Sequence, residues 1–331
     1  MPSALFGRRV AVILQPAIFV GVGKDRKLAG PWDSVVPYPG FNPVASLRVT
    51  FDVQKTIGAE PNQATVIIYN INAQNRAAPK SGDLLTLRAG YAADLVGDAG
   101  PEQLPIVFKG NVSRAMTTRE GANWATKMTC GDLAHKKAKA LDYLPAGSTI
   151  DAVVNRLKDK LKDFGTEVMS DLGSSVAWWL SNQFNRQTGA ASSDGAAAAT
   201  AGVLDKGRAM VGKVADLLTN EMDSIGLAWS VQDNVLIVRP KGGANPEPAI
   251  VLSPATGLVG SPGVTERGGV TGKTLLIGGM TPGRLVRIES SAVTGEYVLT
   301  RVSPRGDTHG PDWTMDFEAD VAGARITLGG A

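Results

Sequence analysis

The chain has 331 residues, of which 43% are hydrophobic and 20% charged, and this excludes a globally disordered protein because disordered chains are poor in apolar residues. A single cysteine, Cys130, and two histidines argue against a disulfide framework and against zinc sites built on thiolate or imidazole. The net charge of +3 lacks the strongly basic balance of a nucleic-acid-binding protein, and 39 glycines with 19 prolines imply the many turns of a β-rich chain.

The N-terminal region predicts a first strand rather than a targeting segment. The apolar run 10–14 follows two arginines, but Gln15 and Pro16 interrupt it and no small-residue cleavage site follows. No stretch reaches the roughly 18 consecutive apolar residues of a membrane span. We therefore expect a soluble protein, made in a reducing compartment and not inserted in a membrane.

The rest of the first third predicts a series of short strands. Apolar and polar residues alternate in several segments, and turn clusters rich in Gly, Pro and Asn separate them. Regular short strands with such turns are typical of an antiparallel barrel or sandwich. The predicted strands are 47–53, 64–70, 84–88, 106–108 and 124–130.

The middle third changes to helical periodicity. Thr149 can cap a helix in which apolar residues recur at three- and four-residue spacing up to Leu161. A second predicted helix has its apolar face between Leu204 and Ile225 and ends at Gly226. A hairpin of strands at 227–231 and 235–238 is expected to follow.

Two segments of the middle third are compositionally unusual. The window 136–162 carries a net charge of +4, which we interpret as a solvated helix face on the outer surface rather than as a DNA-facing lining. Residues 183–202 are low in complexity and rich in Ala and Gly, which is typical of a flexible insertion or linker. The neighbouring apolar stretch 176–180 is interpreted as core, with an anchor for a partner protein as the alternative.

The last third returns to strands, and their order repeats that of the first third. Each passage runs glycine, strand, strand, polar turn and a strand that begins with tryptophan. The first passage takes 42 residues from Gly82 to Trp124, and the second takes 30 from Gly283 to Trp313. The longer loop at 92–104 can absorb the difference. We interpret this as an internal duplication of a β module. Two unrelated hairpins with the same turn chemistry are the alternative.

The sequence contains no string that matches the full pattern of a catalytic motif. The string 268–274 comes nearest to a phosphate-binding loop, but Arg267 occupies the first glycine position and 275–279 is typical of a strand rather than a helix. The string Asp307-Thr-His309 lies between glycines, as in an exposed turn. We therefore expect no enzymatic activity, and no catalytic, cofactor-binding or metal-binding residues.

Several strings, taken in order, resemble a known family. Residues 51–56 and 60–70 resemble the first tube-like domain of tail hub proteins from long-tailed bacteriophages. Residues 256–262 and 306–313 resemble the second tube-like domain of these proteins, and 214–238 resembles the small domain between them. The resemblance leaves out the first ~40 residues and the 183–202 insertion, and no single motif is diagnostic.

The positions matched to the family are expected to serve turns, packing and assembly rather than catalysis. They are Lys55, Pro61, Asn62, Tyr69, Asn70, Gly90, Tyr91, Gly110, Gly257, Pro262, Pro282, Gly283, Gly306, Asp307 and Trp313.

The resemblance implies a mainly β fold with an α+β middle: two tail-tube-like antiparallel β-barrel or sandwich modules plus a small helix-hairpin domain. The expected division is a first tube-like module at 1–143, a middle domain at 144–243 and a second module at 244–331. Three chains with two similar modules each would form a ring of pseudo-sixfold symmetry.

The implied function is that of a structural baseplate hub in the virion tail, assembled in the host cytoplasm. Such a homotrimer joins the hexameric tail tube or distal tail proteins to the trimeric central spike, with the tape-measure protein as a further partner and genomic DNA only in transit. The alternatives are a hub of a contractile injection or secretion apparatus and a tail-borne cell-wall hydrolase. The hydrolase would need paired carboxylates in a cleft, which the sequence does not display.

Overall fold

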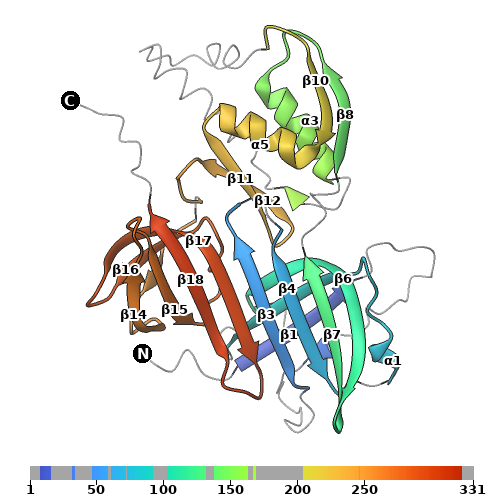
Figure 1. The fold of residues 1–331 in the computed structure, drawn as a ribbon, viewed down its shortest axis with the longest axis vertical. Helices are drawn as coiled ribbons and strands as arrows, with labels where there is room; N and C mark the ends of the chain where they lie inside the picture. Colours follow the sequence, from blue (N-terminus) through green and yellow to red (C-terminus); the bar gives the residue numbers. More distant parts are fainter. Residues whose placement is uncertain are drawn as a thin grey trace. The chain divides into compact units, whose positions relative to one another are not determined.

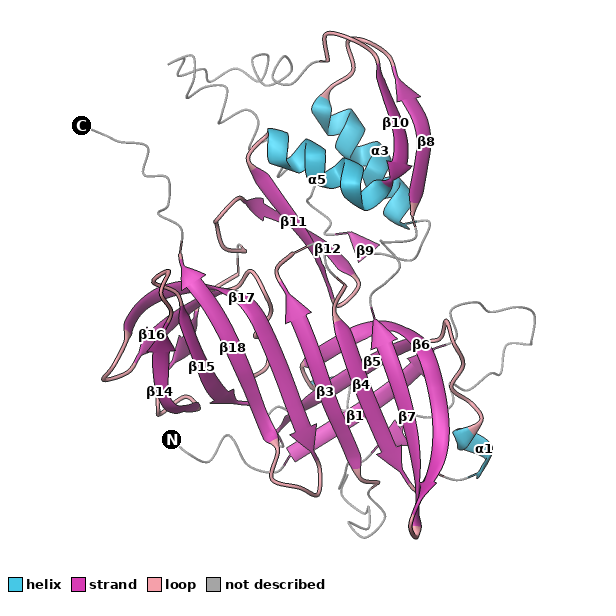
Figure 2. Ribbon diagram, in the orientation of Figure 1, coloured by secondary structure: helices cyan, strands magenta, loops and turns pink. Residues whose placement is uncertain are grey.

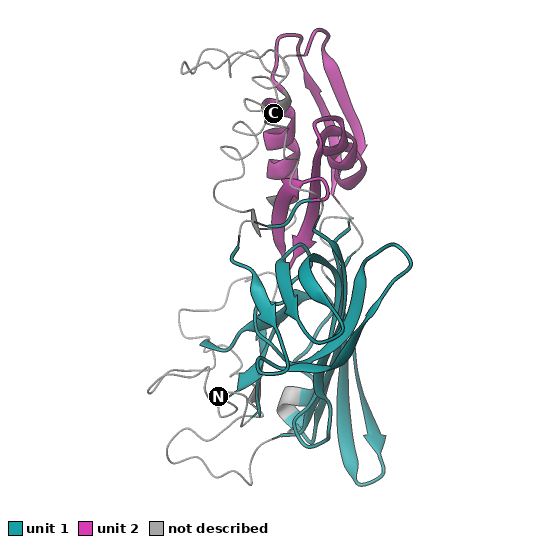
Figure 3. Cartoon of the chain, turned by 90° about the vertical axis from the view of Figure 1, so that its left-hand side faces the viewer, with its two compact units in different colours: residues 1–132, 243–331 teal, residues 133–242 magenta. Residues whose placement is uncertain are grey.

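The computed structural model describes residues 8–15, 32–33, 47–58, 61–71, 73–91, 103–131, 138–162, 167–168, 204–245 and 247–322. The chain folds into two compact units, one of residues 1–132 with 243–331 and one of residues 133–242 (Figure 3). The first and last thirds of the sequence therefore fold together, and the middle third forms a unit of its own.

The first unit is built on one large sheet, which is antiparallel except for a single strand pair (Figures 1 and 2). Its strands from the first third are β1 (Arg8–Gln15), β2 (Trp32–Asp33), β3 (Val49–Thr56), β4 (Gln63–Tyr69), β5 (Leu84–Tyr91), β6 (Ile106–Glu120) and β7 (Asn123–Gly131). Its strands from the last third are β13 (Ile250–Leu252), β14 (Leu258–Val264), β15 (Val270–Leu275), β16 (Leu285–Glu289), β17 (Thr294–Asp307) and β18 (Trp313–Val321). A short helix, α1 (Ala73–Arg76), follows β4.

The two thirds repeat one strand order within this sheet. In the first β module, defined as β1 with β3 to β7, the order is β3-β4-β7-β6-β5-β1. In the second β module, defined as β13 to β18, the order is β14-β15-β18-β17-β16-β13. The modules differ at the last position, because β1 pairs with β5 antiparallel whereas β13 pairs with β16 parallel.

The turn that precedes β5 recurs before β16 with the same hydrogen bonds. Gly82 and Gly283 both have positive φ, 99° and 88°. The Gly82 N–H donates to the Val112 carbonyl at 2.8 Å, and the Gly283 N–H donates to the Leu299 carbonyl at 2.7 Å. A left-handed backbone is accessible to glycine at little cost, which explains why the sequence carries glycine at both positions.

The central hairpin of each module has a β-bulge at the same place. The β6–β7 ladder shifts register between Val112 and Arg114, and the β17–β18 ladder shifts between Leu299 and Arg301. The skipped residue is a hydroxyl residue in both cases. The Ser113 hydroxyl donates to the Thr129 carbonyl at 2.9 Å, and the Thr300 hydroxyl donates to the Glu318 carbonyl at 3.1 Å. Bulges re-aim a strand, so both hairpins bend at matching points.

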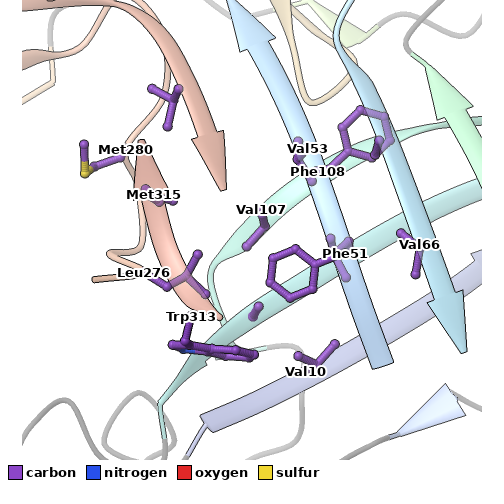
Figure 4. Close-up of a cluster of buried hydrophobic side chains, with 14 of the residues drawn as sticks. Val10, Phe51, Val53, Val66, Val107, Phe108, Leu276, Met280, Trp313 and Met315 are labelled. Carbon is purple, nitrogen blue, oxygen red and sulfur yellow. The ribbon is translucent and has the colours of Figure 1, made fainter. Parts of the chain in front are cut away.

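One hydrophobic core serves both modules. Alternate residues of several strands point inward, as in β3, where Val49, Phe51 and Val53 are buried. The same cluster includes Leu276, Met280, Trp313 and Met315 of the second module, and Figure 4 shows these side chains together on one side of Phe51. A single apolar cluster across two modules means that neither module has a complete core alone.

The second unit contains two helices and two small sheets. Their elements are β8 (Lys139–Leu144), α3 (Ile150–Lys162), β9 (Glu167–Val168), β10 (Arg208–Lys213), α5 (Val214–Ser224), β11 (Leu227–Gln232) and β12 (Val235–Pro240). The strand β8, which the sequence analysis placed in the first module, pairs with β10 in this unit. The hairpin β11–β12 turns at Asp233 and Asn234, both with positive φ.

The first helix and the fold class agree with the sequence, and part of the second helix does not. The Thr149 hydroxyl accepts the Ala152 N–H at 3.1 Å, which confirms the predicted cap of α3. The predicted helical face from Leu204 is wrong before Val214, because residues 208–213 form β10 and leave Val211 64% exposed. The mainly β class with an α+β middle is confirmed.

Some predicted features lie outside the described residues. They include the insertion at 183–202, the stretch 176–180 and two lysines of the basic window, Lys136 and Lys137. Among the helices that the structure describes, none is long and apolar enough to cross a membrane.

The repeated turn predicts unequal costs for two equivalent substitutions. Gly82→Ala places a side chain in open space, so it should lower the free energy of unfolding by about 1–2 kcal/mol through backbone strain alone. Gly283→Ala adds a clash, because its Cβ would lie 2.6 Å from Asn245 Oδ1, and should cost about 1–3 kcal/mol more. Urea unfolding of both variants measures the difference, and equal costs would contradict this account of the turn.

Candidate functional site: the seam between the two β modules

Several of the matched positions, from both modules, lie where β17 meets β3. The first part of β17 pairs with β16, and the second part, from Arg301 to Asp307, pairs antiparallel with β3. Figure 1 shows the red β17 beside the blue β3. We call this ladder, with the side chains of Arg8, Arg48 and Trp313 beside it, the seam. It joins segments about 250 residues apart in the chain.

Aromatic side chains fill the core side of the seam. Trp313 is 2% exposed, and its ring meets Phe51 edge-on at 5.7 Å and Tyr91 edge-on at 6.5 Å between centroids. The Arg8 guanidinium lies 5.5 Å from the centre of the Trp313 ring. Edge-to-face pairs and a cation over an indole both add stabilisation beyond the area they bury. Residues from β1, β3, β5 and β18 thus meet on one tryptophan.

A charged cluster closes the end of the seam. Arg48 donates two hydrogen bonds to the Asp307 carboxylate, from Nε at 3.1 Å and from Nη2 at 2.6 Å. The backbone N–H of His309 donates to the same carboxylate at 2.9 Å. Arg8 donates to the carbonyls of Asp307 and Pro311, each at 3.1 Å. A bidentate arginine–carboxylate pair fixes geometry as well as charge, so this cluster sets the position of the turn after β17.

These contacts move the pKa of Asp307. Burial opposes ionisation of the carboxyl group, but the hydrogen bond from Arg48 and those from the backbone of His309 and Gly310 outweigh it. The pKa of Asp307 therefore lies below its ordinary value. The carboxylate is therefore charged in the folded protein near neutral pH, where it accepts the hydrogen bonds from Arg48.

Two matched glycines allow strands to pass close together. Gly306 pairs with both Phe51 and Trp313, and a Cβ at this position would collide with the Phe51 ring. At Gly110 a Cβ would lie 2.6 Å from the Phe108 ring. Glycine is required at both places by the room that an aromatic ring takes.

The remaining matched positions are turn and packing residues, and most lie outside the seam. Asn70, with φ of 59°, accepts the Trp124 N–H on Oδ1 at 3.0 Å and fixes the start of β7. The Arg48 guanidinium lies over the ring of the preceding residue, Tyr69, at 5.0 Å from the ring centre, so Tyr69 lies beside the seam. Asn62 accepts the Thr56 N–H at 3.0 Å.

The others are placed as follows. Lys55 is buried in β3 opposite Val302, Pro61 is half-buried before β4, Gly90 is buried in β5, Gly257 has φ of 110° before β14, and Pro262 is buried in the β14 bulge. Pro282 and Gly283 lie against Asn245, whose N–H donates to the Gly283 carbonyl at 2.7 Å.

Sequence analysis missed Arg8 and Arg48 as seam residues. Both contact partners about 260 or more residues away in the chain. The available signal was weak: Arg48 lies in the predicted strand 47–53 together with Phe51, but nothing in the local sequence pairs it with Asp307.

Two features that sequence analysis considered for chemistry can be sought among the described residues, a metal-binding cluster and the string 268–274. The described residues hold no group of three or more His, Cys, Asp or Glu side chains that could bind a metal. On the outer face of the second module a shallow hollow contains Asp316 and Glu318, which form ion pairs with Lys273 at 3.5 Å and Arg301 at 3.4 Å. The string 268–274 forms the end of a turn and the strand β15, not a loop before a helix.

Comparison with solved structures identifies the fold. The chain is similar to the 43 kDa tail protein of prophage MuSo2 from Shewanella oneidensis, with a TM-score of 0.54 and 9% identity over 96% of this chain and 99% of that one. It is similar to a tail protein of Neisseria meningitidis, with a TM-score of 0.53 and 11% identity over 95% and 96%.

A third similar structure comes from a secretion system. It is an Escherichia coli component of the type VI secretion system, described as similar to the phage T4 tail proteins gp27 and gp5, with a TM-score of 0.50 and 8% identity over 83% of this chain and 73% of that one. No family model and no curated protein matches the sequence. The predicted resemblance to phage tail proteins is therefore confirmed at the level of the fold.

The charged cluster predicts a pH-dependent loss of stability. Asp307→Asn should lower the free energy of unfolding by about 2 kcal/mol at pH 7, because Arg48 then loses its charged acceptor. The pKa of Asp307 is lowered in the folded state, so its contribution is present above the unfolded-state pKa, about 3.9, and is lost as the pH falls through the folded-state value.

Denaturant unfolding between pH 7 and pH 3 measures this contribution. The difference between the parent protein and Asp307→Asn should be largest near neutral pH and shrink at the acid end. Asp320→Asn is the control, since Asp320 is exposed on β18 and should change stability little. A difference that stays constant with pH would contradict the assigned role of the carboxylate.

Proposed function

We propose that this chain is a structural hub protein of a phage tail baseplate. In this proposal three copies form a ring that joins the hexameric tail tube, or distal tail proteins, to a trimeric central spike. The tape-measure protein is a further partner, and genomic DNA passes through the ring only in transit. The protein would then be located in the virion tail, without catalytic activity of its own.

The observation that carries the proposal is the repetition of one β module within the chain. The two modules share their strand order, their glycine turn and the position of their bulge. Three chains contribute six such modules, which is the number that a ring needs to match a hexameric tube. The similarity in fold to tail proteins of Shewanella and Neisseria supports the same assignment.

The second unit supports the proposed contact with a trimeric spike. Residues 133–242 form it once per chain, with no counterpart elsewhere among the described residues. A trimer would therefore present three copies of this unit. Threefold symmetry is what contact with a trimeric spike requires.

A second candidate function is the hub of a contractile injection or secretion apparatus. The observation that favours it is the similarity in fold to the type VI secretion component and to a chain of the Francisella PdpA–VgrG complex. The latter has a TM-score of 0.50 and 7% identity over 96% of this chain and 58% of that one. The same trimer would then deliver effectors rather than DNA. Proteomic analysis of purified particles decides between the two, since a phage hub is found in DNA-containing virions.

The proposal predicts the mass of the purified protein in solution. Light scattering should give about three times the chain mass of 34.5 kDa. A monomer at high micromolar concentration that becomes a trimer on addition of the spike protein would also agree, because assembly can depend on a partner. A monomer or dimer that no tube or spike protein converts to a trimer would contradict the hub assignment.

A further inference from the structure

We propose that the C-terminal half of β6 in one copy pairs, antiparallel, with β14 of the next copy, so that each joint between chains repeats the seam within a chain. This inference rests on the proposed trimeric ring and adds its interface and register. Its partner is a second copy of this chain, and its basis is the equivalence of the two modules.

The seam within the chain is the template for the proposed joint. There β17 of the second module pairs with β3 of the first. By strand order, β6 is the counterpart of β17, and β14 is the counterpart of β3. Repeating the same contact therefore requires β6 of the first module to pair with β14 of a second module, and that module belongs to another copy.

The residue-by-residue equivalence is fixed by hydrogen bonds that recur. Trp124 and Trp313 begin β7 and β18, and their carbonyls accept from Asn70 at 2.7 Å and Leu276 at 3.1 Å. The carbonyls that precede β3 and β14, those of Arg48 and Gly257, accept from Tyr69 at 2.9 Å and Leu275 at 2.8 Å. The strands thus correspond in register, not only in order.

Both strands of the proposed joint have an open edge among the described residues. β5 pairs with β6 only as far as Asn111, and residues 113–120 have β7 on one side and no strand on the other. β14 pairs only with β15. The equivalent edges of β17 and β3 are the ones that pair in the seam. Open edges of this kind expose unpaired N–H and carbonyl groups, which a second chain can satisfy.

The two equivalent tryptophans differ in burial in the way that the proposal requires. Trp313 is 2% exposed because Phe51 and Tyr91 cover it across the seam, whereas Trp124 is 38% exposed. Each has an arginine over its ring, Arg8 at 5.5 Å and Arg76 at 4.5 Å. Trp124 therefore has the surroundings of Trp313 except for the strand that covers Trp313 in the seam.

Other exposed apolar side chains lie on the same two edges. Met116 of β6 is 44% exposed, and Val259 and Val264 of β14 are 43% and 65% exposed. Burial of these side chains in a joint would stabilise association, because apolar surface would be removed from water. The joint is heterologous, so it closes a ring only where the rotation from module to module is a simple fraction of a turn.

The template gives a register that can be tested. In the seam Arg305 lies opposite Asp52, and their side chains form an ion pair at 3.3 Å, so they project from the same face. The equivalent residues are Thr118 and Gly263. Directly opposed residues in an antiparallel pair have Cα atoms about 4.5–5.5 Å apart, which is within the range that a disulfide bridges.

The test is disulfide formation in the full-length variant Thr118→Cys/Gly263→Cys. A Cβ at Gly263 meets only Thr271 Oγ1, at 3.4 Å, so the substitution should be tolerated. Mild oxidation of the assembled protein, alone or after addition of the spike protein, should give covalent dimers and trimers on a non-reducing gel and stop at the trimer. The native Cys130 should not react, because burial raises its pKa to about 12.

The matched control moves one cysteine by two residues on the same strand. In Glu120→Cys/Gly263→Cys the β6 position is displaced by about 6.6 Å along the strand, beyond the reach of a disulfide. At least a tenfold lower yield is expected. Equal yields in the two variants, absence of cross-linking, or a ladder that continues beyond the trimer would each overturn the inference. A trimer by light scattering without cross-linking would overturn only this joint and leave the hub assignment standing.

A charge on either edge gives a second test. Val264→Lys should lower the fraction of trimer at least tenfold and leave the melting of the monomer unchanged, because Val264 is exposed in the single chain. Val321→Lys is the control, since Val321 is 55% exposed at the end of β18 and lies on neither edge. Equal trimer fractions in the two variants would overturn the inference.

Discussion

The ladder between β17 and β3 is the interaction on which the first unit depends. It joins two β modules that each bury one face of a sheet and would each otherwise leave an edge open. It also brings Trp313 onto Phe51 and Asp307 onto Arg48, which gives the joint an apolar half and a charged half.

Much of this fold can be predicted from local sequence, but the ladder between β17 and β3 cannot. Alternating residues give the strands, Thr149 gives the start of α3, and the order from Gly82 to Trp124 gives the repeat. The helix predicted from Leu204 is a strand in its first part, because β10 pairs with β8, a contact across some 70 residues that periodicity does not report. Arg8 and Arg48 were missed for the same reason, since their partners are brought together only by the seam.

Comparing the two modules indicates which surfaces lack a neighbour, which neither module shows alone. The matching turns and bulges establish which residues correspond. A residue that is buried in one module and exposed in the other then marks a place where a neighbouring strand is missing. Trp124 and Trp313 occupy equivalent positions, yet one is covered and the other exposed. Within the chain, the first module covers the tryptophan of the second module. The tryptophan of the first module lacks such a neighbour, and in the proposed trimer the second module of the next chain supplies it.

Electron cryo-microscopy of the purified protein, alone or with its spike partner, tests the central claim most directly. The account predicts a closed ring of three chains in which six β modules are evenly spaced and the joints between chains superimpose on the seam between β17 and β3. A ring of different copy number would contradict the account. So would a trimer held together only by residues 133–242, with β6 and β14 still exposed.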